Sequence, residues 1–151
     1  DREGALQGAV DALARHGVVI EAVSPVYETA PREVEDQPLY LNAGCRVATD
    51  LDPRDLLDLI KRLEPELGRV AGPRYGPRAI DIDILLWDGG AWADDRLQVP
   101  HPRVTERRFA LVPLLELDPP NAAELRAAEQ ALDPAEQPVD VSPDRLVVPE
   151  S

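Results

Sequence analysis

Two aspartates that stand one residue apart, Asp81 and Asp83, are the pair in this sequence best suited to chemistry. In a strand successive side chains point to opposite faces, so both carboxylates would share one face while Ile82 and its apolar neighbours take the other. Carboxylate oxygens at this spacing suit a hard cation such as Mg²⁺. The positive charge that phosphate oxygens need would come from Arg69, Arg74 and Arg78. Residues 68–87 therefore predict metal-assisted phosphoryl chemistry.

A second polar block follows downstream, where Pro100 and Pro102 hold His101 in a fixed, non-helical position. The arginines nearby in sequence are Arg103, Arg107 and Arg108. We expect a phosphate contact here. A general acid or base is the alternative for His101, but phosphoryl transfer depends more on positioning and charge neutralisation than on proton shuttling. Glu64, beside Pro65, could face the arginine loop, and an ordinary surface carboxylate is an equally good interpretation from spacing alone.

An aromatic ring and a carboxamide, Tyr40 and Asn42, share one face of a predicted strand. Such a pair can stack on and hydrogen-bond a flat heterocycle, but a partly buried tyrosine beside a strand-end asparagine is the commoner arrangement. Phe109 is the only phenylalanine, and the simplest interpretation is that it heads an apolar run into the core. From the residues alone, both interpretations stay open.

Three helices are predicted to position these residues. Apolar spacing predicts the first over 1–16, with Gly17 as its stop. The second begins at Asp52-Pro53, where Asp caps and Pro takes the first helical position, and it would stop at Gly68. Asn121 would cap the third, over 121–132.

Alternating and β-branched stretches predict the strands. They cover residues 18–29, 39–49, 80–86 and 97–99. Pro25 suggests that the first is an edge strand. A turn is predicted at Asp88-Gly89-Gly90, and the proline-rich acidic tail 133–151 is only loosely specified.

Composition limits the class of protein. At 151 residues, with 44% hydrophobic and 30% charged residues, the chain is sized for one domain over 1–151. A formal net charge of −13 disfavours nucleic acid, aromatic content of 4% is too low for an RNA-stacking surface, and no apolar run could span a membrane. The single cysteine, Cys45, and the lack of a signal peptide indicate the cytoplasm. We expect a monomer that acts on small molecules.

Four motifs together resemble one family. They are SPVYETAP, QPLYLNAG, RYGPRAIDIDILLW and VPHPRVTERRFALVPLLELDP, and they resemble 6-hydroxymethyl-7,8-dihydropterin pyrophosphokinase of folate biosynthesis over residues 1–120. The resemblance implies a ferredoxin-like α+β fold, an antiparallel sheet with helices packed mainly on one face. It also implies Mg²⁺-dependent transfer of a pyrophosphoryl group from ATP to the hydroxymethyl oxygen of the pterin, giving AMP.

The resemblance assigns roles to individual residues. Asp81 and Asp83 would hold two Mg²⁺ ions along the triphosphate of ATP. Arg69 and Arg78 match the arginines that clamp the phosphates and support the transition state. Further nucleotide contacts match Glu64, Arg74, Tyr75, His101 and Arg107. The pterin would lie between Tyr40 and Phe109, with Asn42 and the backbone near Thr29 contacting its donor and acceptor edge.

The sequence departs from the family pattern at several points. The first strand of the family, with its Gly-Ser-Asn-Leu-Gly turn, would precede Asp1 and is missing, so we expect a longer natural protein. Ala71 stands where an arginine is frequent, Tyr75 where tryptophan is usual, and the loop 32–36 lacks a common glycine. A non-catalytic ferredoxin-like module that binds a nucleotide or a metal is the alternative. The intact carboxylate pair, arginine set and aromatic pair favour the enzyme.

Overall fold

The structure is a computed structural model that describes residues 2–29, 40–71 and 81–149. Two compact units emerge: the first unit holds 1–21, 47–102 and 148–151, and the second unit holds 22–46 and 103–147. We describe each unit by itself. The described residues form α-helices and small antiparallel sheets, so the predicted α+β class is confirmed.

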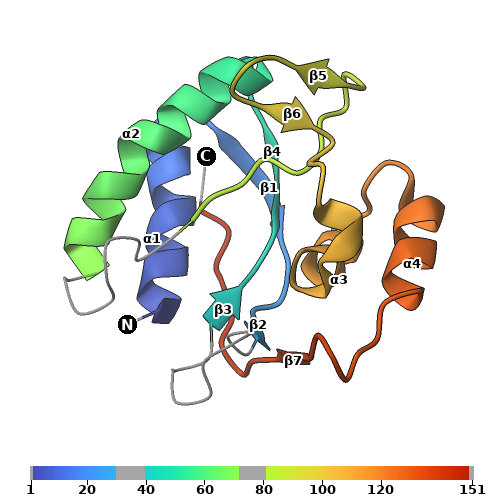
Figure 1. Cartoon of the computed structure of the whole chain (residues 1–151). Helices are drawn as coiled ribbons and strands as arrows, with labels where there is room; N and C mark the ends of the chain where they lie inside the picture. Colours follow the sequence, from blue (N-terminus) through green and yellow to red (C-terminus); the bar gives the residue numbers. More distant parts are fainter. Residues whose placement is uncertain (1, 30–39, 72–80, 150–151) are drawn as a thin grey trace. The chain divides into compact units, whose positions relative to one another are not determined.

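Two helices, α1 (Arg2–Arg15) and α2 (Pro53–Ala71), form the frame of the first unit and lie side by side in Figure 1. As predicted, Gly17 follows α1 in the left-handed region, with φ +89°. Asp52 caps α2, because its Oδ1 accepts the Asp55 N–H at 2.9 Å. Both helices carry buried side chains, among them Ala12, Leu13, Leu59, Ile60 and Leu63.

The predicted stop of the second helix at Gly68 is wrong, since α2 continues through Pro65 and Gly68 to Ala71. Leu63 and Leu67, on either side of Pro65, are both buried. Burying a leucine contributes about 2 kcal/mol, whereas a glycine inside a helix costs about 1 kcal/mol. Burial of Leu67 therefore outweighs the cost of the neighbouring Gly68.

A short antiparallel hairpin in the first unit consists of β5 (Trp92–Ala93) and β6 (Gln98–Val99). β6 confirms the strand predicted over 97–99. The predicted turn before the hairpin is also present, because the Gly90 N–H donates to the Trp87 carbonyl at 3.2 Å and Gly90 takes φ +103°.

Residues 81–87, which we call the acidic segment, are not assigned to a strand, so the strand predicted over 80–86 is wrong in its described part. A strand needs a ladder of backbone hydrogen bonds to a neighbour. Here the Ile82 N–H donates to a side chain, Oε2 of Glu64, at 2.9 Å. The Leu85 carbonyl accepts the His101 N–H, also at 2.9 Å. Individual contacts, and not a ladder, hold this segment.

A three-stranded sheet carries the second unit, with β2 (Tyr27–Thr29) between β3 (Tyr40–Asn42) and β7 (Val139–Val141). Both pairings are antiparallel. β2 is thus a central strand and not the predicted edge. β7 falls in the tail that we left unspecified, because three residues of alternating polarity are too short a pattern to predict a strand.

The strands predicted over 18–29 and 39–49 are each broken in two. Their outer parts are β1 (Val19–Val23) and β4 (Cys45–Ala48), which pair with each other. At the break, Ser24 and Gly44 are joined twice: the Ser24 N–H donates to the Gly44 carbonyl and the Gly44 N–H donates to Ser24 Oγ, both at 2.8 Å. Pro25 follows at once and offers no N–H to a ladder.

The second unit also holds η2 (Val104–Glu106), α3 (Arg108–Leu115) and α4 (Ala122–Gln130), of which α3 and α4 contact each other (Figure 1). Leu111, Leu114 and Leu125 are buried in this unit. Asn121 precedes α4 in the left-handed region, with φ 59°, and makes no side-chain cap hydrogen bond, so the predicted cap is wrong. Among the described helices of the chain, none is both long and apolar enough for a membrane span.

Candidate functional site

The acidic segment presents two carboxylates to solvent. Asp81 and Asp83 are exposed, while Ile82 and Ile84 are half-buried, so exposure alternates over residues 81–84. Within the described ranges no three or more His, Cys, Asp or Glu side chains gather as a metal cage. Two carboxylates fit Mg²⁺ all the same, because this ion is usually bound by one or two carboxylates together with water and substrate phosphates.

Glu64, from the fourth turn of α2, faces the acidic segment. Its side chain is 17% exposed. One carboxylate oxygen, Oε2, accepts the N–H of Ile82 at 2.9 Å, and the other, Oε1, lies 3.3 Å from Lys61 Nζ. Glu64 is therefore not an ordinary surface carboxylate, and whether it faces the arginine loop stays a prediction, because most of that loop lies outside the described residues. Glu64 holds the backbone between the two aspartates.

His101 is joined to the acidic segment through its backbone. Its N–H donates to the Leu85 carbonyl at 2.9 Å, and its side chain is half-buried. This contact brings the Pro-His-Pro block beside the segment that carries the aspartates. Glu64, the acidic segment and His101 thus form one group within the first unit.

Most of the predicted arginine loop, which carries Arg69, Arg74 and Arg78, falls on residues 72–80 and so lies outside the described residues. Arg74, Tyr75 and Arg78 fall there, and of Arg69 only the backbone, in the last turn of α2, is described. Their assignment to the phosphates and the nucleotide stays a prediction from the sequence.

The second unit brings together Thr29 and Asn42, which the resemblance assigns to the pterin. Thr29 is 7% exposed, and its Oγ1 accepts an N–H from Nδ2 of Asn42 at 2.8 Å. The register of β2 and β3 places Thr29 opposite Tyr40 and Tyr27 opposite Asn42. A ladder and a side-chain hydrogen bond therefore both fix the Asn42 amide.

Tyr40 and Phe109 are unusually exposed for aromatic residues, at 54% and 40%. They come from β3 and α3, two elements of the second unit that contact each other. Phe109 does not enter the core, because the buried residues of α3 are Leu111, Pro113 and Leu114, so the simplest interpretation from the sequence is wrong. Two exposed rings on neighbouring elements suit a flat, partly apolar ligand.

Arg107 lies over the ring of Phe109, with Cζ 5.5 Å from the ring centroid. A guanidinium at this distance from a ring face makes a cation–π contact. The resemblance assigns Arg107 to the nucleotide, and in the structure it contacts an aromatic residue assigned to the pterin. Arg108, its neighbour, is a structural residue: it donates from Nη1 to the Gln137 carbonyl at 2.7 Å and pairs with Glu129 at 3.3 Å.

Tyr27, which lies opposite Asn42 in the sheet, ionises less readily than a free tyrosine. Burial is the main cause that raises the pKa of its phenol, and the negative charge of Glu116 raises it further. Tyr27 is 8% exposed and directly opposite Asn42 in the sheet. The phenol therefore stays neutral and adds no charge beside the amide.

Sequence reasoning missed the backbone groups at Ile82 and Leu85, which take part in the site without a side-chain signal. It also missed Trp92 and Asp94, which lie in the hairpin that follows the acidic segment. Asp94 accepts the indole N–H of Trp92 at 2.8 Å. Only the polar turn Asp94-Asp95-Arg96 could have indicated this cluster.

Comparison with known proteins places these residues in a family context. Residues 1–119 match the family model described as 7,8-dihydro-6-hydroxymethylpterin-pyrophosphokinase. The match includes Glu64, the acidic segment, His101, and the residues on β2, β3 and α3 described above.

Three relatives illustrate the range of lengths. A 2-amino-4-hydroxy-6-hydroxymethyldihydropteridine pyrophosphokinase of Bacillus subtilis is 45% identical over 118 residues, covering 78% of this chain and 71% of the relative. One of Methylorubrum extorquens is 42% identical over 139 residues, covering 89% and 88%. A mitochondrial folate synthesis bifunctional protein of Pisum sativum is 43% identical over 117 residues, covering 78% of this chain. The chain spans only 23% of that longer relative.

Proposed function

Because the chain belongs to the 7,8-dihydro-6-hydroxymethylpterin-pyrophosphokinase family, we propose that it transfers a pyrophosphoryl group from ATP to 6-hydroxymethyl-7,8-dihydropterin. The products are AMP and the pterin pyrophosphate, as an early step of folate synthesis. One observation carries the proposal furthest: Glu64 holds the backbone between Asp81 and Asp83, while both aspartates face solvent. This arrangement suits a polyphosphate and its metal.

The bond changes need no covalent intermediate with the protein. The hydroxymethyl oxygen of the pterin attacks the β-phosphorus of ATP, and a new O–P bond forms. The bond from the β-phosphorus to the oxygen that bridges to the α-phosphate breaks, and AMP leaves with that oxygen. The hydroxyl proton passes to solvent or to a phosphate oxygen. Positioning and charge neutralisation are therefore the main tasks of the protein.

Asp81 and Asp83 would hold two Mg²⁺ ions, which neutralise the phosphate oxygens and orient the leaving group when bound. The exposed carboxylates are the groups of the acidic segment that can reach such ions. Glu64 is a positioning residue in this proposal, since its carboxylate is occupied by the Ile82 N–H and by Lys61. His101, with Arg69, Arg74 and Arg78, would contact the phosphates, and Tyr75 would close over the nucleotide.

The pterin would stack between Tyr40 and Phe109. Asn42 donates one side-chain N–H to Thr29, which orients its Oδ1 as an acceptor for ring N–H or amino groups. A flat heterocycle with donors and acceptors along one edge matches these groups better than an aliphatic alcohol does. Arg107, over Phe109, would meet the phosphate end of the same ligand.

The natural partners in this proposal are small molecules, and we expect neither nucleic acid nor a membrane as a partner. Monomeric state and cytoplasmic location stay predictions. Some plant relatives are named mitochondrial, so the compartment differs within the family.

The test is the nucleotide product. Purified protein is incubated with ATP, Mg²⁺ and 6-hydroxymethyl-7,8-dihydropterin, and AMP and ADP are separated by chromatography. We expect AMP whose formation requires both the pterin and Mg²⁺. ADP as the product, or AMP formed equally well without the pterin, would refute the proposal.

A further inference from the structure

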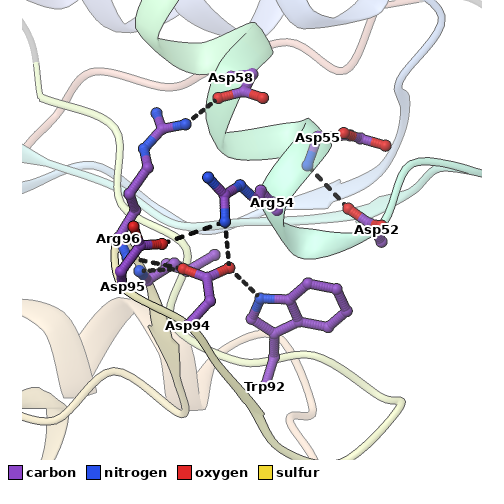
Figure 2. Close-up of polar contacts among 9 residues, drawn as sticks. Asp52, Arg54, Asp55, Asp58, Trp92, Asp94, Asp95 and Arg96 are labelled. Carbon is purple, nitrogen blue, oxygen red and sulfur yellow. Dashed lines mark hydrogen bonds and ion pairs between the residues drawn. The ribbon is translucent and has the colours of Figure 1, made fainter.

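The hairpin of β5, β6 and the turn 94–97 depends on one carboxylate. Oδ1 of Asp94 accepts the backbone N–H groups of Arg96 at 2.7 Å and Leu97 at 3.0 Å, and Oδ2 accepts the indole N–H of Trp92 at 2.8 Å (Figure 2). The Arg96 N–H is the largest cause that lowers the pKa of Asp94, followed by the Trp92 N–H. Turn and strand are therefore joined through the ionised form of this side chain.

Three ion pairs, made by one arginine of the helix and one of the turn, tie the turn to α2 (Figure 2). Arg54 of the helix reaches into the turn, with Nη1 3.2 Å from Asp95 Oδ1 and 3.7 Å from Asp94 Oδ2. Arg96 of the turn reaches back, with Nη1 2.6 Å from Oδ1 of Asp58 on the helix. Arg54 and Asp58 are four residues apart and share a helix face. An isolated surface ion pair contributes little, but ion pairs that run from the helix to the turn and from the turn to the helix together fix an orientation.

The hairpin also contacts the end of the acidic segment. The rings of Trp92 and Trp87 meet edge to face, with centroids 5.6 Å apart and planes at 82°. A Cβ on Gly89 would lie 2.5 Å from the Trp87 ring, so only glycine leaves room for this ring beside the turn. β6 then leads directly to His101, whose N–H meets Leu85.

Helix α2 thus holds the acidic segment at both ends. Near its start, Glu64 accepts the Ile82 N–H. At its end, Trp87 packs on Trp92, which is bonded to the turn that α2 anchors. The segment has no strand assignment, so it is held by these two attachments together with the His101 N–H that donates to the Leu85 carbonyl.

We propose that the hairpin is a positioning device for the metal-binding carboxylates. Its positioning residues, Asp94, Asp58 and Arg96, fix the end of the acidic segment on α2, so that Asp81 and Asp83 keep the orientation that a metal–phosphate complex requires. The role of the two aspartates rests on the proposed function. The restraint on the segment does not, and it can be measured without activity.

The matched variants are Asp58→Asn and Asp55→Asn. Both variants remove one negative charge from the first two turns of α2. Only the side chain of Asp58 pairs with the turn, whereas the contact of Asp55 in Figure 2 is made by its backbone N–H, which donates to Asp52. Asp94→Asn is the stronger disruption, because an amide cannot accept all three hydrogen bonds. Hydrogen–deuterium exchange of the complete protein is followed by mass spectrometry at a temperature where every variant is folded.

We expect Asp94→Asn and Asp58→Asn to speed exchange in residues 81–87 as well as in the hairpin, and Asp55→Asn to change neither. Exchange in β2 and β3 serves as the internal reference. In active protein, the Mg²⁺ concentration for half-maximal rate should rise by about threefold to tenfold, as is usual for residues remote from a site. The KM for the pterin should stay unchanged.

A charge exchange supplies the rescue. Asp58→Arg combined with Arg96→Asp restores an ion pair with reversed sense, and it should recover most of the protection that Asp58→Arg alone loses. Faster exchange confined to 88–99, or an unchanged Mg²⁺ requirement in an active Asp94→Asn protein, would overturn the positioning role. If the unmodified protein forms no AMP, the proposed function fails. The restraint of the acidic segment by the hairpin is then still tested, by hydrogen exchange in residues 81–87 without any activity measurement.

Discussion

The three-stranded sheet of the second unit and the acidic segment of the first unit hold the side chains of the candidate site in different ways. In the sheet, Thr29 and Asn42 stand on paired strands, and their side chains are bonded to each other at 2.8 Å. In the acidic segment, Asp81 and Asp83 are carried by a backbone without a strand assignment, which Glu64 holds from a helix.

The difference suits the two kinds of ligand. A flat heterocycle is recognised by directional hydrogen bonds and stacking, for which a laddered backbone gives a fixed frame. A metal–polyphosphate complex is recognised mainly by charge, which tolerates small movements better than a hydrogen-bond pattern does. We therefore expect substitutions in the sheet to weaken binding of the pterin, and substitutions around the acidic segment to weaken binding of Mg²⁺ and ATP.

The largest expected effect is on the carboxylates themselves. Asp81→Asn and Asp83→Asn should each lower kcat by about a thousandfold, because metal ions contribute several kcal/mol of charge stabilisation to such transfers. Steady-state rates of AMP formation measure this loss, with Asp88→Asn, an exposed aspartate in the following turn, as the control. An equal loss of pterin affinity in these variants would break the separation of the two regions.

On the other side, Tyr40→Ala and Phe109→Ala should raise the dissociation constant of the pterin by about tenfold to hundredfold, the usual value of a stacked ring. Calorimetric titration in the presence of a non-hydrolysable ATP analogue measures it. Tyr40→Phe, which keeps the ring, should bind almost as well as the unmodified protein. A change in Mg²⁺ requirement without a change in pterin binding would contradict the assignment of these rings.

An intermediate effect is expected at Glu64. Glu64→Leu removes the acceptor of the Ile82 N–H and should raise the Mg²⁺ requirement about tenfold, since partners that orient metal ligands typically matter to this extent. Glu64→Gln keeps an acceptor oxygen and should retain most of the affinity. Equal defects in both variants would show that the charge of Glu64, and not its hydrogen bond, is what the site uses.

Substitution of Thr29 should have a smaller effect on binding of the pterin. Thr29→Val keeps the shape but removes the oxygen that accepts from Asn42, so the KM for the pterin should rise about threefold to tenfold. Thr29→Ser retains the oxygen and should behave like the unmodified protein. Comparing the KM for the pterin with the KM for ATP tests whether the substitution affects binding of the pterin and leaves binding of ATP unchanged.

The smallest expected effect is on the stability of the folded protein at acidic pH. The pKa of Asp94 is lower in the folded protein, so its contribution to stability is complete above the ordinary carboxylate value of about 4 and is lost as the pH falls through the lower folded value. Denaturant unfolding from pH 5 to pH 2 should therefore show a steeper loss of stability for the unmodified protein than for Asp94→Asn. Parallel curves would show that the folded protein does not favour the ionised form.

Two helix boundaries were predictable from patterns confined to one element, although the Asn121 cap was not. Gly17 and Asp52 mark the end and the start of helices, and in both cases a local backbone or side-chain property determines the outcome. The end of α2 was not predictable, because burial of Leu67 decides against the breaker Gly68. Burial is a property of the packed unit and is not encoded in three or four neighbouring residues.

For the candidate site, the shared exposure of the two aspartates was predictable, and the contacts that hold their segment were not. The i, i+2 spacing of Asp81 and Asp83 gave the exposed pair, although the expected strand is missing. The contact of Glu64 with Ile82 joins positions 18 residues apart through a backbone N–H, for which no side-chain pattern exists. β7 likewise depends on its partner β2, and its three residues were too few to indicate a strand.

The fate of the β-phosphate tests the proposed reaction most directly. ATP labelled on its β-phosphate is incubated with the protein, Mg²⁺ and 6-hydroxymethyl-7,8-dihydropterin, and the label is traced after separation of the products. We predict that the label appears in the pterin product in equal amount to the AMP formed. Label recovered in ADP or in free pyrophosphate, with none on the pterin, would contradict pyrophosphoryl transfer by this chain.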